Sequence, residues 1–125
     1  MIKTDVSELK GGPKYGDALL LDTAYAIVNL DNGKRYIGMT RNPKMRIKAH
    51  FSGLKNHHHP NKRLRKESNC RFGYEILEEE IAFRDRAKKE REYMLKFKTY
   101  DERYGYNSKK DPCLLLKDVQ DKIAT

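Results

Sequence analysis

Cysteine is scarce in this 125-residue chain, which contains only Cys70 and Cys113. Two cysteines are too few for a disulfide framework, and they lack the spacing of a metal-binding cluster. Long apolar runs are missing as well, since none approaches the roughly 18 residues that a membrane span requires. Residues 1–12 also lack the apolar core of a secretion signal. These absences exclude a membrane partner and predict an intracellular protein, in the cytoplasm or with the nucleoid.

Acidic residues are absent from residues 41–66, which contain nine lysines and arginines. The whole chain has 27 Lys and Arg against 18 Asp and Glu, a formal charge of +9. This clustering predicts a surface that faces a polyanion, with nucleic acid as the first candidate. The alternative is a solvated basic face that balances the acidic stretch at residues 75–92. The predicted nucleic-acid contacts are Arg41, Lys44, Lys48, Lys55, Lys62, Arg63, Arg65 and Lys66.

The order of the local patterns predicts one α/β (α+β) domain. Residues 24–30 and 34–40 read as strands on either side of Asp31-Asn32-Gly33, a strong hairpin signal. Asn42 before Pro43 is typical of a helix start and predicts a helix over residues 43–54. The other predicted elements are a short basic helix at 61–66, a third strand at 71–77 and a long helix at 82–98. The chain thus divides into an N-terminal extension (1–21), the domain (22–108) and a C-terminal tail or short helix (109–125).

The predicted hairpin carries two tyrosines on one polar face. The expected register pairs Tyr25 with Thr40 and Ile27 with Gly38, so Tyr25 and Tyr36 project from the same side. Gly38 has no side chain, and a gap in a strand often admits a ligand or another backbone. The alternative is that both tyrosines are ordinary half-buried aromatic residues.

Histidine and arginine share a face of the first predicted helix. Arg46 and His50 are four residues apart, so their side chains are neighbours. An arginine offers a planar, permanently charged fork for a phosphate, and a histidine can exchange a proton with an oxygen. The alternative is a solvated basic helix. The triplet His57-His58-His59 predicts a solvated loop, because consecutive residues rarely bind one ion together.

A glutamate interrupts the apolar stripe of the second long helix. Phe83, Ala87, Met94 and Phe97 form this stripe at helical spacing. Glu90 falls in the middle of the stripe, whereas Glu92 points roughly the opposite way. A carboxylate on an apolar face is costly unless it is paired or bound to a cation. Glu90 is therefore a candidate metal ligand, and a buried salt bridge to an arginine is the alternative.

These residues together resemble the GIY-YIG nuclease family. Tyr25 is followed, after ten residues, by Tyr36-Ile37-Gly38, and Arg46 comes eight residues after this glycine. His50 one turn later, the histidine loop, the glutamate-bearing helix and the closing residues 99–107 follow in the family's order. The resemblance covers about residues 22–108. The first motif departs from the family, since it reads Thr23-Ala24-Tyr25 and keeps only the tyrosine.

The resemblance implies a small three-stranded antiparallel sheet flanked by helices, and hydrolysis of a phosphodiester with one Mg²⁺ or Mn²⁺. It implies that Glu90, or alternatively Glu92, holds the metal. Tyr25, or less well Tyr36, would take the proton of the attacking water, which requires a lowered phenol pKa. The remaining implied roles are charge neutralisation by Arg46, hydrogen bonding by His50, closure of the loop by Asn107, and support from Gly38 and His59.

The implied substrate is double-stranded DNA, and RNA stays open. We expect a mainly monomeric endonuclease that can act as a dimer on DNA. Its biological role could be that of a free-standing phage or mobile-element nuclease, a restriction enzyme or a repair nuclease. The competing hypothesis is a non-catalytic nucleic-acid-binding module on a degenerate scaffold of the same family.

Overall fold

The structure, a computed structural model, describes residues 1–9, 14–16 and 19–107. Cys113 and the predicted C-terminal helix lie outside these residues. The elements, in chain order, are η1 (Val6–Glu8), β1 (Lys14–Gly16), β2 (Leu19–Asn29), β3 (Arg35–Thr40), α1 (Pro43–Lys55), α2 (Lys62–Lys66), β4 (Phe72–Ala82), η2 (Phe83–Asp85) and α3 (Arg86–Phe97). Among the described residues, no helix is long and apolar enough to cross a membrane.

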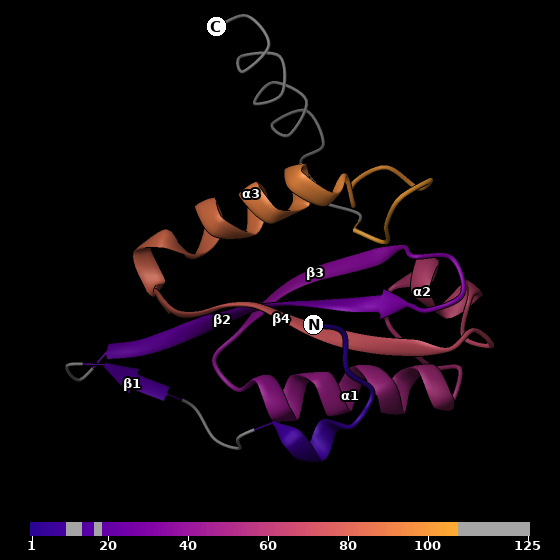
Figure 1. The fold of residues 1–125 in the computed structure, drawn as a ribbon, viewed down its shortest axis with the longest axis horizontal. Coiled ribbons are helices and arrows are strands. Elements are labelled where there is room, and N and C mark those ends of the chain that lie inside the picture. Colours follow the sequence, from indigo (N-terminus) through magenta and orange to yellow (C-terminus); the bar gives the residue numbers. More distant parts are fainter. Residues whose placement is uncertain (10–13, 17–18, 108–125) are drawn as a thin grey trace, which may run out of the picture.

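The sheet is antiparallel, with β2 at its centre (Figure 1). One edge of β2 pairs with β3 and the other with β4, which confirms the predicted three-stranded unit. The short strand β1 adds a fourth member, because it pairs with the first three residues of β2. This strand lies within the segment predicted as an extension, and β2 begins five residues before the predicted strand at residues 24–30.

Helices cover both faces of the sheet, with α1 on one face and α3 on the other (Figure 1). The α1 face is buried around Tyr25, Ile27, Ile47, Leu54, Leu64, Tyr74 and Tyr106. The α3 face is buried around Ala26, Val28, Ile37 and Met94. Alternate residues of β2 therefore enter two different cores, because successive side chains in a strand point to opposite faces.

The hairpin register differs by two residues from the prediction. Tyr25 pairs with Gly38, and Ile27 pairs with Tyr36. The turn lies one residue earlier in the chain than expected, because the N–H of Asn29 bonds to the carbonyl of Lys34 and Gly33 adopts a φ of +78°. A shift of two keeps every side chain on its face, so both tyrosines still share one side.

The third strand and the second long helix also differ from their predicted limits. β4 extends to Ala82, five residues beyond the prediction, through register shifts opposite residues 22–25 and a left-handed Glu80 (φ +59°). Three consecutive glutamates, Glu78–Glu80, weakened the strand signal, since glutamate is depleted in strands. Phe83 lies in η2 before α3 and is 59% exposed, so the apolar stripe predicted through Phe83 is wrong at that end.

The first residues of the chain pack against the domain. Lys3 forms a two-way backbone bridge with Tyr74 of β4, with N···O distances of 2.8 and 2.7 Å. Val6 and Leu9 pack against the core on the α1 face. Figure 1 shows η1 lying beside α1. This N-terminal segment therefore covers part of β4.

Candidate active site

Tyr25 is a deeply buried member of the predicted site, at 2% exposure. Its ring crosses directly over Gly38 of the neighbouring strand. A Cβ at Gly38 would lie 2.8 Å from Tyr25 Cε1 and closer still to the phenol carbon and oxygen. The gap that the sequence indicated at Gly38 is thus filled by the phenol of Tyr25 itself, which only glycine permits.

A chain of hydrogen bonds ends on the Tyr25 hydroxyl. The N–H of Asn61 donates to His59 Nδ1 over 3.0 Å, so a neutral His59 carries its proton on Nε2. His59 Nε2 lies 2.6 Å from His50 Nδ1 and donates to it, which leaves the proton of His50 on Nε2. His50 Nε2 then donates to the hydroxyl oxygen of Tyr25 over 2.7 Å. Tyr25 therefore receives a hydrogen bond from His50 and keeps its own proton for another acceptor.

The electrostatics of the two histidines agree with this assignment. Burial lowers the pKa of His50 to about 3, with smaller effects from His59 and Arg46. Burial also lowers the pKa of His59, and the charge of Arg65 adds to the effect. Both rings are therefore neutral near pH 7, as the chain of hydrogen bonds requires.

Tyr36 completes an aromatic cluster around His50. The ring centroids of Tyr36 and His50 are 5.2 Å apart, and those of Tyr25 and His50 are 5.5 Å apart. Both tyrosine rings thus pack near the same imidazole. Their shared face and their common neighbour follow from the period of the strands and from the position of His50 on α1.

The ionisation of both tyrosines depends on Arg46 and Glu90. Burial raises the pKa of Tyr25. The neighbouring Tyr36 and Glu90 raise this pKa further, whereas Arg46 lowers it. Burial likewise raises the pKa of Tyr36, with Glu90 adding to the rise and Arg46 opposing it. The expected lowering of the phenol pKa is therefore not found, because burial outweighs the neighbouring cations.

Glu90 and Glu92 lie in different surroundings. Glu90 acts electrostatically on both phenols from α3, whereas Arg46 and His50 approach them from α1. Glu92 lies 4.0 Å from Lys89, with its side chain 43% exposed. The proximity of Glu90 to the tyrosines favours it as the metal ligand, which stays a prediction.

The closing segment is attached to β3 by a side-chain amide. Asn107 accepts a hydrogen bond from the N–H of Ile37 (2.8 Å) and donates one to the carbonyl of Ile37 (2.9 Å), as a paired strand would. The backbone of Tyr106 also bonds to Arg35. Asn107 thus ties the closing loop to the residue before Gly38.

The predicted nucleic-acid contacts divide into two groups. Arg63 donates to the carbonyl of Asn107, and Arg65 donates to the carbonyl of His59, so both have structural partners. His57 and His58 are exposed, whereas His59 is 3% exposed and bonds to His50. The other basic side chains lie on or beside α1 and α2: Arg41, Lys48, Lys55, Lys62 and Lys66 are exposed, and Lys44 is half-buried.

Two residues near the tyrosines were not predicted from the sequence as members of the site. Arg86 is one helical turn before Glu90, and its charge lowers the pKa of Tyr25. Asn61, interpreted only as the start of a helix, also fixes the tautomer of His59 through its N–H. The i, i+4 spacing of Arg86 and Glu90 was an available signal, but the partner of Arg86 comes from a distant strand.

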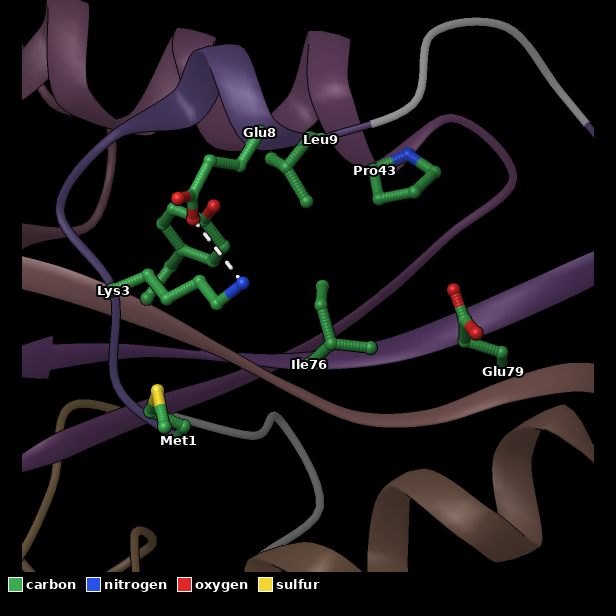
Figure 2. A pocket seen from close by; sticks show the side chains of 8 residues that line it. Met1, Lys3, Glu8, Leu9, Pro43, Ile76 and Glu79 are labelled. Carbon is green, nitrogen blue, oxygen red and sulfur yellow. Dashed lines mark ion pairs between the residues drawn. The ribbon is translucent and has the colours of Figure 1, made fainter.

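Cavities help to locate the site. One cavity of about 380 Å³ lies between the N-terminal segment and β4, and Figure 2 shows Lys3 paired with Glu8 in it. None of the predicted catalytic residues lines that cavity. A second cavity of about 490 Å³ is lined by Arg46, Arg41 and Arg86, among others. In the described part of the chain, no group of three or more His, Cys, Asp and Glu residues could hold a metal ion.

Comparisons with known proteins agree with this fold. The model of the GIY-YIG catalytic domain matches residues 23–107. Among solved structures, the catalytic domain of the intron endonuclease I-TevI, in a mutant form, is similar, with a TM-score of 0.62 and 26% sequence identity. The match covers 71% of this chain and 95% of that one. No curated protein sequence matches this chain significantly. Because the family model covers most of the sequence, this chain belongs to the GIY-YIG nuclease family.

Proposed function

We propose that this protein is a divalent-metal-dependent endonuclease that hydrolyses phosphodiester bonds in DNA. One observation carries the proposal: the buried Tyr25 hydroxyl receives a hydrogen bond from His50, and the charges of Arg46 and Glu90 act on it from the two helices. Nucleic-acid binding alone would not need a buried phenol between a guanidinium and a carboxylate.

We propose that Tyr25 first releases its own proton to solvent and that the resulting phenolate accepts the proton of the attacking water. Its hydrogen bond from His50 stabilises the ionised phenol, because a donor favours the charged form of an acceptor. The guanidinium groups of Arg46 and Arg86 favour ionisation as well, while burial opposes it. His50 acts as a donor and not as a base, since its Nδ1 already accepts from His59.

Arg46 is proposed to neutralise the charge that grows on the phosphoryl group. It is exposed on α1, it lines the 490 Å³ cavity, and its charge lowers the pKa of both tyrosines. A fixed guanidinium near a reacting phosphate typically contributes through preorganised electrostatics. Its position one turn before His50 brings it to the same face as the histidine chain.

The donor chemistry at Glu90 fits Mg²⁺ or Mn²⁺. Mg²⁺ keeps several of its waters and is commonly bound by one or two carboxylates together with substrate phosphates. A single carboxylate beside two phenols, without a preformed cluster among the described residues, suits such an ion. When bound, the ion would polarise a phosphoryl oxygen, stabilise the leaving oxygen and offset the Glu90 charge that disfavours a Tyr25 phenolate.

A single active site of this kind is proposed to cut one strand at a time. The described residues contain a single set of Tyr25, Arg46 and Glu90, so one chain is proposed to nick a duplex, and double-strand breaks require two chains or two events. The basic side chains along α1 and α2 would follow the phosphate backbone.

Cleavage assays test the proposal. Supercoiled plasmid and a single-stranded RNA are incubated with the protein and Mg²⁺, Mn²⁺ or EDTA. We expect cleavage of DNA with either metal and none with EDTA. Intact plasmid together with a gel shift would instead support the non-catalytic binding module. Preferential cleavage of the RNA would refute DNA as the substrate.

A further inference from the structure

A buried carboxylate lies close to the proposed active site without a role in it. Asp22 of β2 is 0% exposed, and neither of its carboxylate oxygens accepts a hydrogen bond from a described residue. Its ion-pair partner is Arg86, whose Nε lies 3.7 Å from Oδ1. Burying an ionisable group is costly, and a long single pair repays little of that cost. Stability alone therefore gives no reason for this pair.

The ion pair with Asp22 orients Arg86, whose side chain is partly exposed to solvent. The side chain of Arg86 is 41% exposed, and it lines the 490 Å³ cavity. The ion pair joins Nε to the buried carboxylate, and the partly exposed side chain still reaches the cavity, where its guanidinium can meet a ligand. A planar fork held in one orientation loses less entropy when it binds a phosphate.

A second arginine that lines the cavity, Arg41, is oriented in a different way. The guanidinium of Arg41 lies over the ring of Phe83, with its carbon 5.3 Å from the ring centroid. Phe83 is 59% exposed, so this ring is available as a support at the surface. Arg41, Arg46 and Arg86 line one cavity, and no Asp or Glu is among its described lining residues. Such a cavity attracts an anion, and it has room for a phosphate group.

We propose that this cavity binds the phosphate next to the scissile phosphate of the nucleic-acid strand, through Arg41 and Arg86, and that Asp22 is the positioning residue that aims Arg86. This inference rests on the proposed function, because Arg46 is assigned there to the scissile phosphate itself. Arg41 and Arg86 then hold the strand in register with the tyrosines.

The first test measures affinity for a fluorescein-labelled 20-base-pair duplex in EDTA by anisotropy, over a range of salt concentrations. Arg86→Ala should weaken binding roughly tenfold, because a charged hydrogen bond is lost. It should also reduce the slope of log K against log salt by about 1. The matched control is Arg84→Ala, since Arg84 is 88% exposed and lines no part of the cavity. Equal effects of Arg84→Ala and Arg86→Ala would overturn the proposal.

A double-mutant cycle tests the role of Asp22. Asp22→Asn should weaken binding roughly threefold, because the charge of Arg86 remains but its orientation is lost. In the Asp22→Asn/Arg86→Ala double variant, affinity should equal that of Arg86→Ala alone. Independent, additive losses would show that Asp22 is merely structural. The double variant also removes both members of the pair, so it avoids the unpaired buried carboxylate that could prevent Arg86→Ala from folding.

Single methylphosphonate linkages locate the contact on the strand. They are placed at each phosphate within two positions of a mapped cut in a defined duplex. At one flanking position, the methylphosphonate should weaken DNA binding by the wild type roughly tenfold. The same linkage should weaken binding by Arg86→Ala less than about twofold. Equal sensitivity of both proteins at every position would refute the subsite. A wild-type protein that binds DNA but makes no cut would refute the proposed function. In that case, the salt dependence of binding by the wild type and Arg86→Ala would still test the phosphate subsite.

Discussion

Adding a methyl group at Gly38 probes the position of the Tyr25 phenol. The new Cβ would lie 2.8 Å from Tyr25 Cε1, whereas carbon atoms in contact are normally about 3.5–4.0 Å apart. The ring must therefore move by about 1 Å, away from its hydrogen bond with His50. Overpacking of this kind typically costs about 1–3 kcal/mol of stability. A displacement of about 1 Å in a catalytic group costs on the order of 100-fold in rate.

We thus expect Gly38→Ala to remain folded and to nick plasmid on the order of 100 times more slowly than the wild type. The assay is a single-turnover nicking time course beside urea denaturation. Gly33→Ala is the matched control, because Gly33 has a φ of +78° and nothing lies within 4 Å of its added Cβ. It should lose about 1 kcal/mol through backbone strain and cleave normally. Wild-type cleavage by Gly38→Ala would refute the assigned position of Tyr25.

Three further predictions concern single side chains. Tyr25→Phe should abolish nicking while gel-shift affinity is retained, because only the hydroxyl is removed; an active variant would exclude Tyr25 as the base. Glu90→Gln should abolish nicking with equal or tighter DNA binding, whereas Glu92→Gln should stay active; the reverse result would assign the metal to Glu92. The pKa of His50 is lowered from 6.5 to about 3, so the unfolded chain binds the extra proton between these values and stability falls as the pH falls through this range. Through this group, the free energy of unfolding changes by at most about 1.4 kcal/mol per pH unit. Urea denaturation at pH 7 and pH 5 should show a smaller change in this free energy for His50→Gln than for the wild type. An equal change in both proteins would contradict the buried, neutral ring.

Local patterns were sufficient to predict the fold class. The Asn42–Pro43 signal placed the start of the first helix at Pro43, as observed, because the Asn42 side chain and the proline act within the first turn. The hairpin faces were also correct, since a register shift of two preserves them. The register itself depended on contacts outside the hairpin, because Asp31 and Leu30 bond to Arg71 at the start of β4.

The candidate site was predictable where residues share an element, and it was not predictable where they meet across elements. Arg46 and His50 are neighbours on one helix, so their spacing revealed them. Asp22 and Arg86 are 64 residues apart in sequence and meet only because β2 and the start of α3 pack together. The histidine chain likewise depends on Asn61, whose N–H reaches His59 only in the folded loop.

A plasmid time course tests the central claim most directly. Wild-type protein and Glu90→Gln, each shown by light scattering to be monomeric, are incubated with supercoiled plasmid and Mg²⁺. We predict that the wild type accumulates nicked circles before linear DNA and that Glu90→Gln leaves the plasmid supercoiled. Equal nicking by both proteins, or linear DNA from a dimer without a nicked intermediate, would contradict a one-metal site that cuts one strand at a time.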